Sequence, residues 1–136
     1  MSDKNPVVKY SATEIAQRLK DAGADVHLPT DEQIPIVESL HTGPSLIIAG
    51  AGSGKTETMS ARVIWLVANG LVTPDQVLGL TFTRKAAGEL TVRIRKRLRQ
   101  LKSAGALPDP KLVEDTKKWL RGEPEAHEDW SVCIFL

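Results

Sequence analysis

This chain of 136 residues is poor in cysteine, in aromatic residues and in long apolar runs. Its single cysteine, Cys133, excludes an internal disulfide framework and a zinc cluster built from several thiolates. Its longest apolar stretches fall far short of the roughly 18 residues that a membrane span needs. Residues 1–10 carry charges and no apolar segment, which excludes a secretory signal peptide. We therefore expect a cytoplasmic protein without membrane contact.

What remains is the composition of an ordinary globular domain. Hydrophobic residues make up 41% of the chain and charged residues 26%, with a formal net charge of +1. This length suffices for one domain with a modest core. The three histidines are scattered and indicate no metal site. Because the total charge is nearly zero, only the local distribution of charge points to a partner.

Two capping patterns stand before the middle of the chain. Ser11 with Glu14 three residues later predicts the start of a helix. Thr30 with Gln33 predicts the start of a second helix. Pro35 would lie near the end of its first turn, slightly later than the position that proline prefers, so it should cost the helix one hydrogen bond or bend it.

Strand and helix signals then alternate. Residues 45–49 form a short apolar run that predicts a buried strand, and residues 55–69 predict a helix that is apolar on most sides. Such a helix is covered on more than one face, and Trp65 within it should lie in the core. Residues 77–82 predict a second strand, and residues 84–102 a long amphipathic helix. This order predicts an α/β fold with a parallel sheet.

The loop after the first strand has the spacing of a phosphate-binding P-loop. It comprises Ala49, Gly50, Ala51, Gly52, Ser53, Gly54, Lys55 and Thr56. Glycines let several backbone N–H groups converge on a phosphate, and the following helix adds its positive N-terminal end. Lys55 suits the β- and γ-phosphates, and the Thr56 hydroxyl suits Mg²⁺. A plain flexible turn is the alternative, but the flanking strand and helix favour ATP binding.

Three segments resemble, in order, motifs of the superfamily 1 DNA helicases of the UvrD/Rep type. Residues 29–37 (PTDEQIPIV) are similar to the Q motif, and residues 46–58 (LIIAGAGSGKTET) look like motif I. Residues 77–98 (VLGLTFTRKAAGELTVRIRKRL) closely resemble motif Ia. The resemblance covers roughly residues 11–102. The amino-acid sequence of these segments is most similar to that of actinobacterial helicase–nuclease subunits of the AdnB kind.

This resemblance implies a RecA-like P-loop NTPase fold, a parallel sheet with flanking helices that is incomplete here. It implies ATP and Mg²⁺ as cofactors and ATP-driven 3′→5′ translocation on single-stranded DNA with unwinding. A helicase–nuclease partner subunit is also implied.

The resemblance further implies roles for residues at matching positions. Gln33 would hydrogen-bond the adenine, and the nucleotide-binding segment would run from Ala49 to Glu57, with Lys55 and Thr56 serving catalysis. The expected contacts to single-stranded DNA are Thr81, Phe82, Thr83 and Arg84, the last at a position that is often Asn in the family. Two alternatives stay open: Gln33 as a plain capping-box residue and Phe82 as ordinary core.

The helix expected at residues 84–102 is strongly basic. Only Glu89 opposes its positive residues, which are Arg84, Lys85, Arg93, Arg95, Lys96, Arg97, Arg99 and Lys102. A solvated helix face is one interpretation. However, a run of one sign repels itself and lacks acidic partners at i,i+4, whereas DNA phosphates supply the missing counter-charge.

Several parts of a working motor are missing. P-loop enzymes need acidic residues to hold Mg²⁺ and to orient the attacking water, and no apolar strand here is followed by an Asp-Glu pair. We divide the chain into a flexible N-terminus (1–10), the N-terminal part of a helicase ATP-binding domain (11–105), and a linker with a divergent or truncated tail (106–136). A frameshift or premature stop near residue 126 would explain that tail.

We therefore expect weak folding stability, and neither hydrolysis nor unwinding by this chain alone. Two other functions stay open. One is a stand-alone nucleotide-binding or regulatory P-loop module. The other is a small P-loop kinase or NTPase, for which the sequence shows neither an acceptor site nor a second acidic motif.

Overall fold

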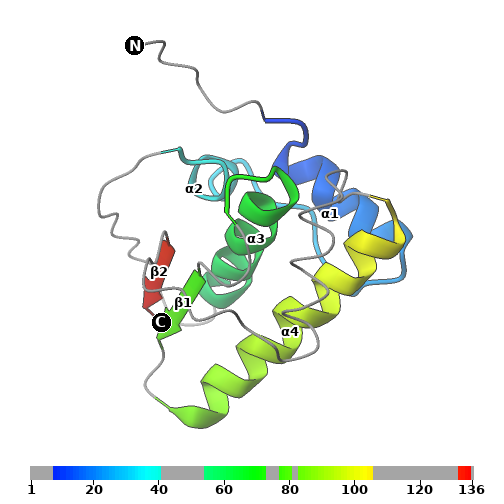
Figure 1. The fold of residues 1–136 in the computed structure, drawn as a ribbon. Coiled ribbons are helices and arrows are strands. Elements are labelled where there is room, and N and C mark those ends of the chain that lie inside the picture. The colour runs from blue at the N-terminus through cyan, green and yellow to red at the C-terminus, as the bar shows by residue number, and fades with distance from the viewer. Residues whose placement is uncertain (1–7, 41–53, 73–76, 81–82, 106–131, 136) are drawn as a thin grey trace.

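A computed structural model describes residues 8–40, 54–72, 77–80, 83–105 and 132–135. For the two strands, 77–80 and 132–135, it describes the backbone alone. Its elements, in chain order, are α1 (Ala12–Asp21), α2 (Ile34–Val37), α3 (Lys55–Ala68), β1 (Val77–Leu80), α4 (Arg84–Ser103) and β2 (Val132–Phe135) (Figure 1). The strand predicted at 45–49 lies outside the described residues. None of the described helices is long and apolar enough to span a bilayer.

Helix α3 is the centre of the helical core. It packs against α1, α2 and α4, so the prediction that it is covered on more than one face is confirmed (Figure 1). Its buried apolar side chains are Val63, Ile64, Trp65, Leu66, Val67 and Ala68. The helix ends where Gly70 adopts a φ of 70°, a left-handed conformation that favours glycine.

The first helix begins where its capping pattern predicts. The Ser11 Oγ accepts a hydrogen bond from the Glu14 backbone N at 3.1 Å. Ile15 and Leu19, one turn apart, are both buried. The carboxylate of Glu38, just after α2, accepts a further bond from the Ala12 backbone N at 2.7 Å, and this contact joins α1 to α2.

Trp65 and Asn69 hold the chain that precedes α1 against α3. The Trp65 Nε1 donates to the Tyr10 carbonyl at 2.9 Å. The Asn69 Oδ1 accepts from the backbone N of Lys9 at 2.8 Å and from that of Tyr10 at 2.9 Å. The buried indole is therefore fixed by packing and by a hydrogen bond, and its predicted place in the core is confirmed.

Helix α4 and the two strands form a β-α-β unit. The strands pair in parallel, with Val77 opposite Val132 and Leu80 opposite Phe135, and α4 lies between them in the chain. Parallel strands require such a crossover connection. Within the described residues, this pair is the whole extent of the sheet. The apolar stripe expected on α4 is buried at Leu90, Ile94, Leu98 and Leu101, while Ala87, which was expected to belong to it, is only partly buried.

Candidate nucleotide site at the start of α3

The described part of the predicted P-loop, residues 54–56, is the start of α3. Gly54 precedes the helix with a φ of 83°, a left-handed conformation that side chains other than glycine rarely adopt. Residues 49–53 lie outside the described part of the chain. The first N–H groups of a helix have no intrahelical acceptor and carry partial positive charge. The side chains of Lys55 and Thr56 are exposed at this end, so the end fits a phosphate group.

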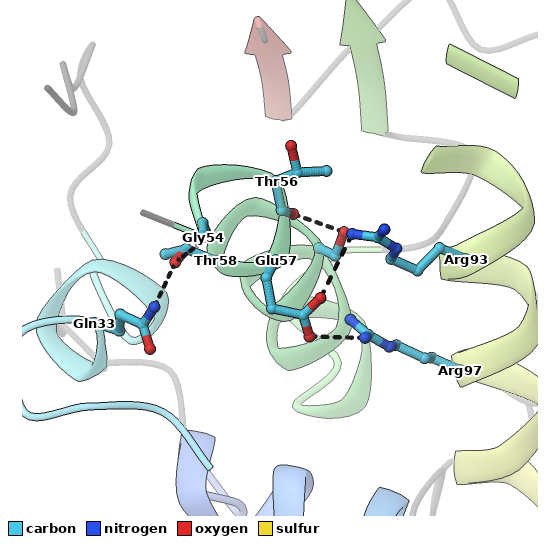
Figure 2. Close-up of polar contacts among 8 residues, drawn as sticks. Gln33, Gly54, Thr56, Glu57, Thr58, Arg93 and Arg97 are labelled. Atoms are coloured by element: carbon cyan, nitrogen blue, oxygen red, sulfur yellow. Dashed lines mark hydrogen bonds and ion pairs between the residues drawn. The ribbon is translucent and has the colours of Figure 1, made fainter. Parts of the chain in front are cut away.

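Gln33 connects the turn before α2 to this end of α3. Its Oε1 accepts from the Thr30 backbone N at 3.0 Å, and its own backbone N donates to the Thr30 Oγ1 at 3.3 Å. This reciprocal pair has the hydrogen bonds of a capping box, but it closes the turn at residues 30–33 that precedes α2. Its Nε2 donates to the Thr58 Oγ1 at 3.2 Å, and that hydroxyl donates to the Gly54 carbonyl at 3.0 Å (Figure 2). Capping therefore does not account for the whole side chain.

Helix α2 begins later than the pattern predicts. Thr30 and Gln33 form a turn, and the helix itself starts at Ile34. Pro35 consequently stands in the first turn of the helix as observed. The Ile34 backbone N already donates to the Thr30 carbonyl at 3.0 Å in the helical manner, so the series of bonds is interrupted where Pro35 lacks an N–H, as expected.

Arg62 of α3 holds the other end of α2 and was missed by the sequence analysis. Its Nη1 donates to three carbonyls, those of Ile36 at 3.2 Å, Val37 at 3.2 Å and Ser39 at 2.9 Å. The last carbonyls of a helix have no intrahelical donor, so the two N–H groups of this guanidinium nitrogen supply what the helix lacks. Burial lowers the pKa of Arg62 below its ordinary value. Arg62 and Thr58 thus fix α2, and with it Gln33, on α3.

Replacing Arg62 by methionine should loosen α2 locally. The carbonyls lose their donor, which costs about 1–2 kcal/mol of local stability. The Val37 and Glu38 amides, which bond to Gln33 and Ile34, should then exchange with solvent faster in native-state hydrogen exchange. The exposed residue Lys20, replaced by methionine, is the matched control. Unchanged protection in Arg62→Met would contradict this anchoring role.

Glu57 is turned toward α4. Its Oε1 lies 2.7 Å from the Arg97 Nη2, and its Oε2 lies 3.5 Å from the Arg93 Nη1 (Figure 2). Arg97 is only 7% exposed. The carboxylate next to the expected phosphate position is therefore neutralised and does not oppose an anion. Two of the positive charges on α4, those of Arg93 and Arg97, thus have an acidic partner on another helix, α3, and not at i,i+4 within α4.

The expected DNA-contacting residues are only partly described. Thr83 caps α4, since its Oγ1 accepts from the Ala86 backbone N at 3.1 Å. The Arg84 side chain is exposed at the start of the helix. Thr81 and Phe82 lie outside the described residues. A contact with single-stranded DNA here stays a prediction.

A small pocket of about 40 Å³ lies beside Gln33, between α1, α2 and α3. Its lining is mostly apolar, with Thr58, Glu57 and Arg97 among its polar members. Among the described residues, no three His, Cys, Asp or Glu side chains gather to hold a metal ion.

Comparisons with a family model and with curated proteins all identify the same family of DNA helicases. The family model described as the UvrD/REP helicase N-terminal domain matches residues 29–134. The chain is 57% identical over 53 residues to DNA helicase IV of Escherichia coli, a match that covers 39% of this chain and 8% of that protein. It is 53% identical over 53 residues to the ATP-dependent DNA helicase UvrD2 of Mycobacterium tuberculosis, with the same 39% and 8% coverage.

A third relative is the ATP-dependent DNA helicase Rep of Buchnera aphidicola. This match is 47% identical over 62 residues and covers 46% of this chain and 9% of that protein. The chain thus matches less than a tenth of the length of each of these relatives.

Proposed function

Because this chain belongs to the family of UvrD/REP helicase N-terminal domains, we propose that it supplies the ATP-binding part of a DNA helicase motor. Membership of this family implies a P-loop NTPase fold. The observation that carries the proposal is the arrangement at the start of α3. There the Gln33 amide, the left-handed Gly54 and the exposed Lys55 and Thr56 side chains gather at one helix end.

Each residue contributes one kind of contact to the triphosphate. Lys55 would place its ammonium on the β- and γ-phosphates, and Thr56 would direct its hydroxyl to Mg²⁺, which neutralises phosphate charge when bound. Residues 49–53 would complete the cradle with backbone N–H groups. Glu57 would contribute its backbone N–H, because its carboxylate is held by Arg97.

Gln33 supports a role in base recognition. Its Nε2 uses one hydrogen on Thr58, and the second makes no hydrogen bond with a described residue. A primary amide that keeps a donor and an acceptor lone pair suits an adenine edge. The bond to Thr58 would then hold the amide at a fixed distance from the phosphate end of α3.

The parent activity proposed from the relatives is ATP hydrolysis coupled to 3′→5′ movement on single-stranded DNA. Residues 81–84 would contact the single-stranded DNA. Because the sequence resembles AdnB-like subunits, the parent protein would also have a helicase–nuclease partner subunit. Because no Asp-Glu pair follows an apolar strand of this sequence, this chain would bind ATP without hydrolysing it.

The test is a titration of the purified chain with a fluorescent ATP analogue and Mg²⁺. We expect saturable binding that Lys55→Ala weakens at least tenfold, which corresponds to about 1.4 kcal/mol or more. Lys20→Ala removes an exposed lysine from α1 and should bind as the unmodified chain does. Circular dichroism establishes that all three proteins are folded. Equal binding by the Lys55 and Lys20 variants, or none by a folded unmodified chain, would refute the proposal.

A further inference from the structure

The side-chain amide of Gln33 is held at both of its ends. Its Oε1 accepts from the Thr30 backbone N at 3.0 Å, and its Nε2 donates to the Thr58 Oγ1 at 3.2 Å. A backbone N–H can only donate, so Thr30 determines which end of the amide is the oxygen. A half-turn of the amide would therefore place two donors against each other at Thr30. The direction of the amide depends next on what Thr58 can accept.

The Thr58 hydroxyl accepts from Gln33 because its only hydrogen is used elsewhere. It donates this hydrogen to the Gly54 carbonyl, one helical turn before it, at 3.0 Å (Figure 2). The atom that approaches its lone pairs must consequently be a donor. Thr58 is only 6% exposed, so water has little access to the hydroxyl. The nitrogen end of the amide is thus fixed beside the start of α3, where a methyl group on Gly54 would lie 3.6 Å from the Gln33 Nε2.

The bond to Thr58 also limits the hydrogens that a purine base can meet. An amide nitrogen carries two hydrogens, and one of those on Gln33 is already bound to Thr58. Adenine presents one acceptor, N7, beside one donor, the N6 amino group, whereas guanine presents two acceptors, N7 and O6. The held amide has one N–H and one oxygen lone pair left, which match adenine. An amide released from Thr58 could turn and give both of its hydrogens to guanine.

We propose that Thr58 is a positioning residue that makes the nucleotide site discriminate against guanine. This inference rests on the proposed function, because it requires a purine nucleotide beside Gln33. Thr58 lies one position beyond the nucleotide-binding segment that the sequence predicts, which ends at Glu57. It acts through Gln33, by fixing which end of the amide donates and by occupying one of its two hydrogens.

Thr58→Val tests this role with little change in side-chain shape. Valine neither donates nor accepts, so the Gln33 amide loses its partner, while the Gly54 carbonyl keeps its bond from the backbone N of residue 58 at 2.9 Å. Thr58→Ser keeps the hydroxyl and should behave as the unmodified chain does. Thr91→Val is the matched control on α4. The Thr91 Oγ1 donates to the Ala87 carbonyl at 2.8 Å in the same manner, so this variant removes an equivalent helix bond away from Gln33.

The measurement is displacement of the fluorescent ATP analogue from the full chain by ATP, by GTP and by inorganic triphosphate, each with Mg²⁺. The unmodified chain should bind ATP more tightly than GTP. In Thr58→Val the ratio of these two affinities should fall at least about fivefold, because the free amide no longer leaves an acceptor of guanine unpaired. The affinity for inorganic triphosphate, which has no base, should not change. Thr58→Ser and Thr91→Val should both keep the original ratio.

An unchanged ratio in Thr58→Val, or an equal fall in Thr91→Val or Thr58→Ser, would overturn the proposal. Equal weakening of all three ligands in Thr58→Val would overturn it too, since that result would show only a structural role. Triphosphate binding that depends on Lys55 but does not distinguish ATP from GTP would refute this inference and leave the proposed function standing. If the folded chain binds none of the three ligands, both are refuted.

Discussion

Replacing Trp65 by alanine is expected to remove most of the stability of the helical core. The side chain is 1% exposed and lies at the centre of α3, where α1 and α4 also pack. Deleting a buried indole costs about 3–5 kcal/mol, because the cavity closes only in part. The carbonyl of Tyr10 also loses its donor. Since small domains have only about 5–15 kcal/mol of stability, this one change should leave a large unfolded fraction.

The measurement is urea unfolding followed by far-ultraviolet circular dichroism, which reports the helices directly. Trp65→Phe is the matched control: it keeps an aromatic ring in the core and removes the hydrogen bond to Tyr10. It should cost about 1–2 kcal/mol. If the alanine variant unfolds at the same urea concentration as the phenylalanine variant, Trp65 does not hold the core through its packing.

Local signals predicted the helices of this chain well. The Ser11 cap and the amphipathic pattern of α4 depend on residues within a few positions of one another. Such signals are readable because helix geometry relates each residue to its neighbours three and four positions away. The same reasoning started α2 too early, because a turn from Thr30 to Gln33 precedes the helix, which begins at Ile34.

The contacts between elements could not be predicted in this way. Arg93 and Glu57 are 36 positions apart, and the carbonyls that Arg62 binds lie 23 to 26 positions before it. No periodicity links residues so distant. The pairing of β1 with β2 is of the same kind, because Val77 and Val132, which lie opposite each other, are 55 positions apart.

For the candidate site, the sequence predicted which residues belong to it, and the structure shows which hydrogen bonds and ion pairs hold the surrounding elements in place. Gly54, Lys55 and Thr56 follow from the P-loop pattern alone. The Gln33–Thr58–Gly54 chain of hydrogen bonds joins the turn before α2 to the start of α3. On the other side, Glu57 attaches the same turn of α3 to α4. The first turn of α3 is thus held from two sides, by the element expected to recognise the base and by the helix expected to contact DNA.

The second large effect is expected at the Glu57–Arg97 pair, and it should be asymmetric. Removing Glu57 leaves a guanidinium that is almost fully buried without its closest partner, which should cost about 3 kcal/mol. Removing Arg97 leaves a carboxylate that is 35% exposed, remains near Arg93 and can be hydrated. Glu57→Leu should therefore lower the urea midpoint more than Arg97→Met does.

The double variant Glu57→Leu/Arg97→Met tests the cause of this asymmetry. Apolar side chains of similar volume often replace a buried ion pair without loss, because they avoid the cost of removing two charges from water. The double variant should consequently be more stable than Glu57→Leu alone, with a coupling energy of about 1–3 kcal/mol in the double-mutant cycle. Additive losses would show that the two side chains act independently. The ion pair with the buried Arg97 would then not be what stabilises the packing of α4 against the first turn of α3.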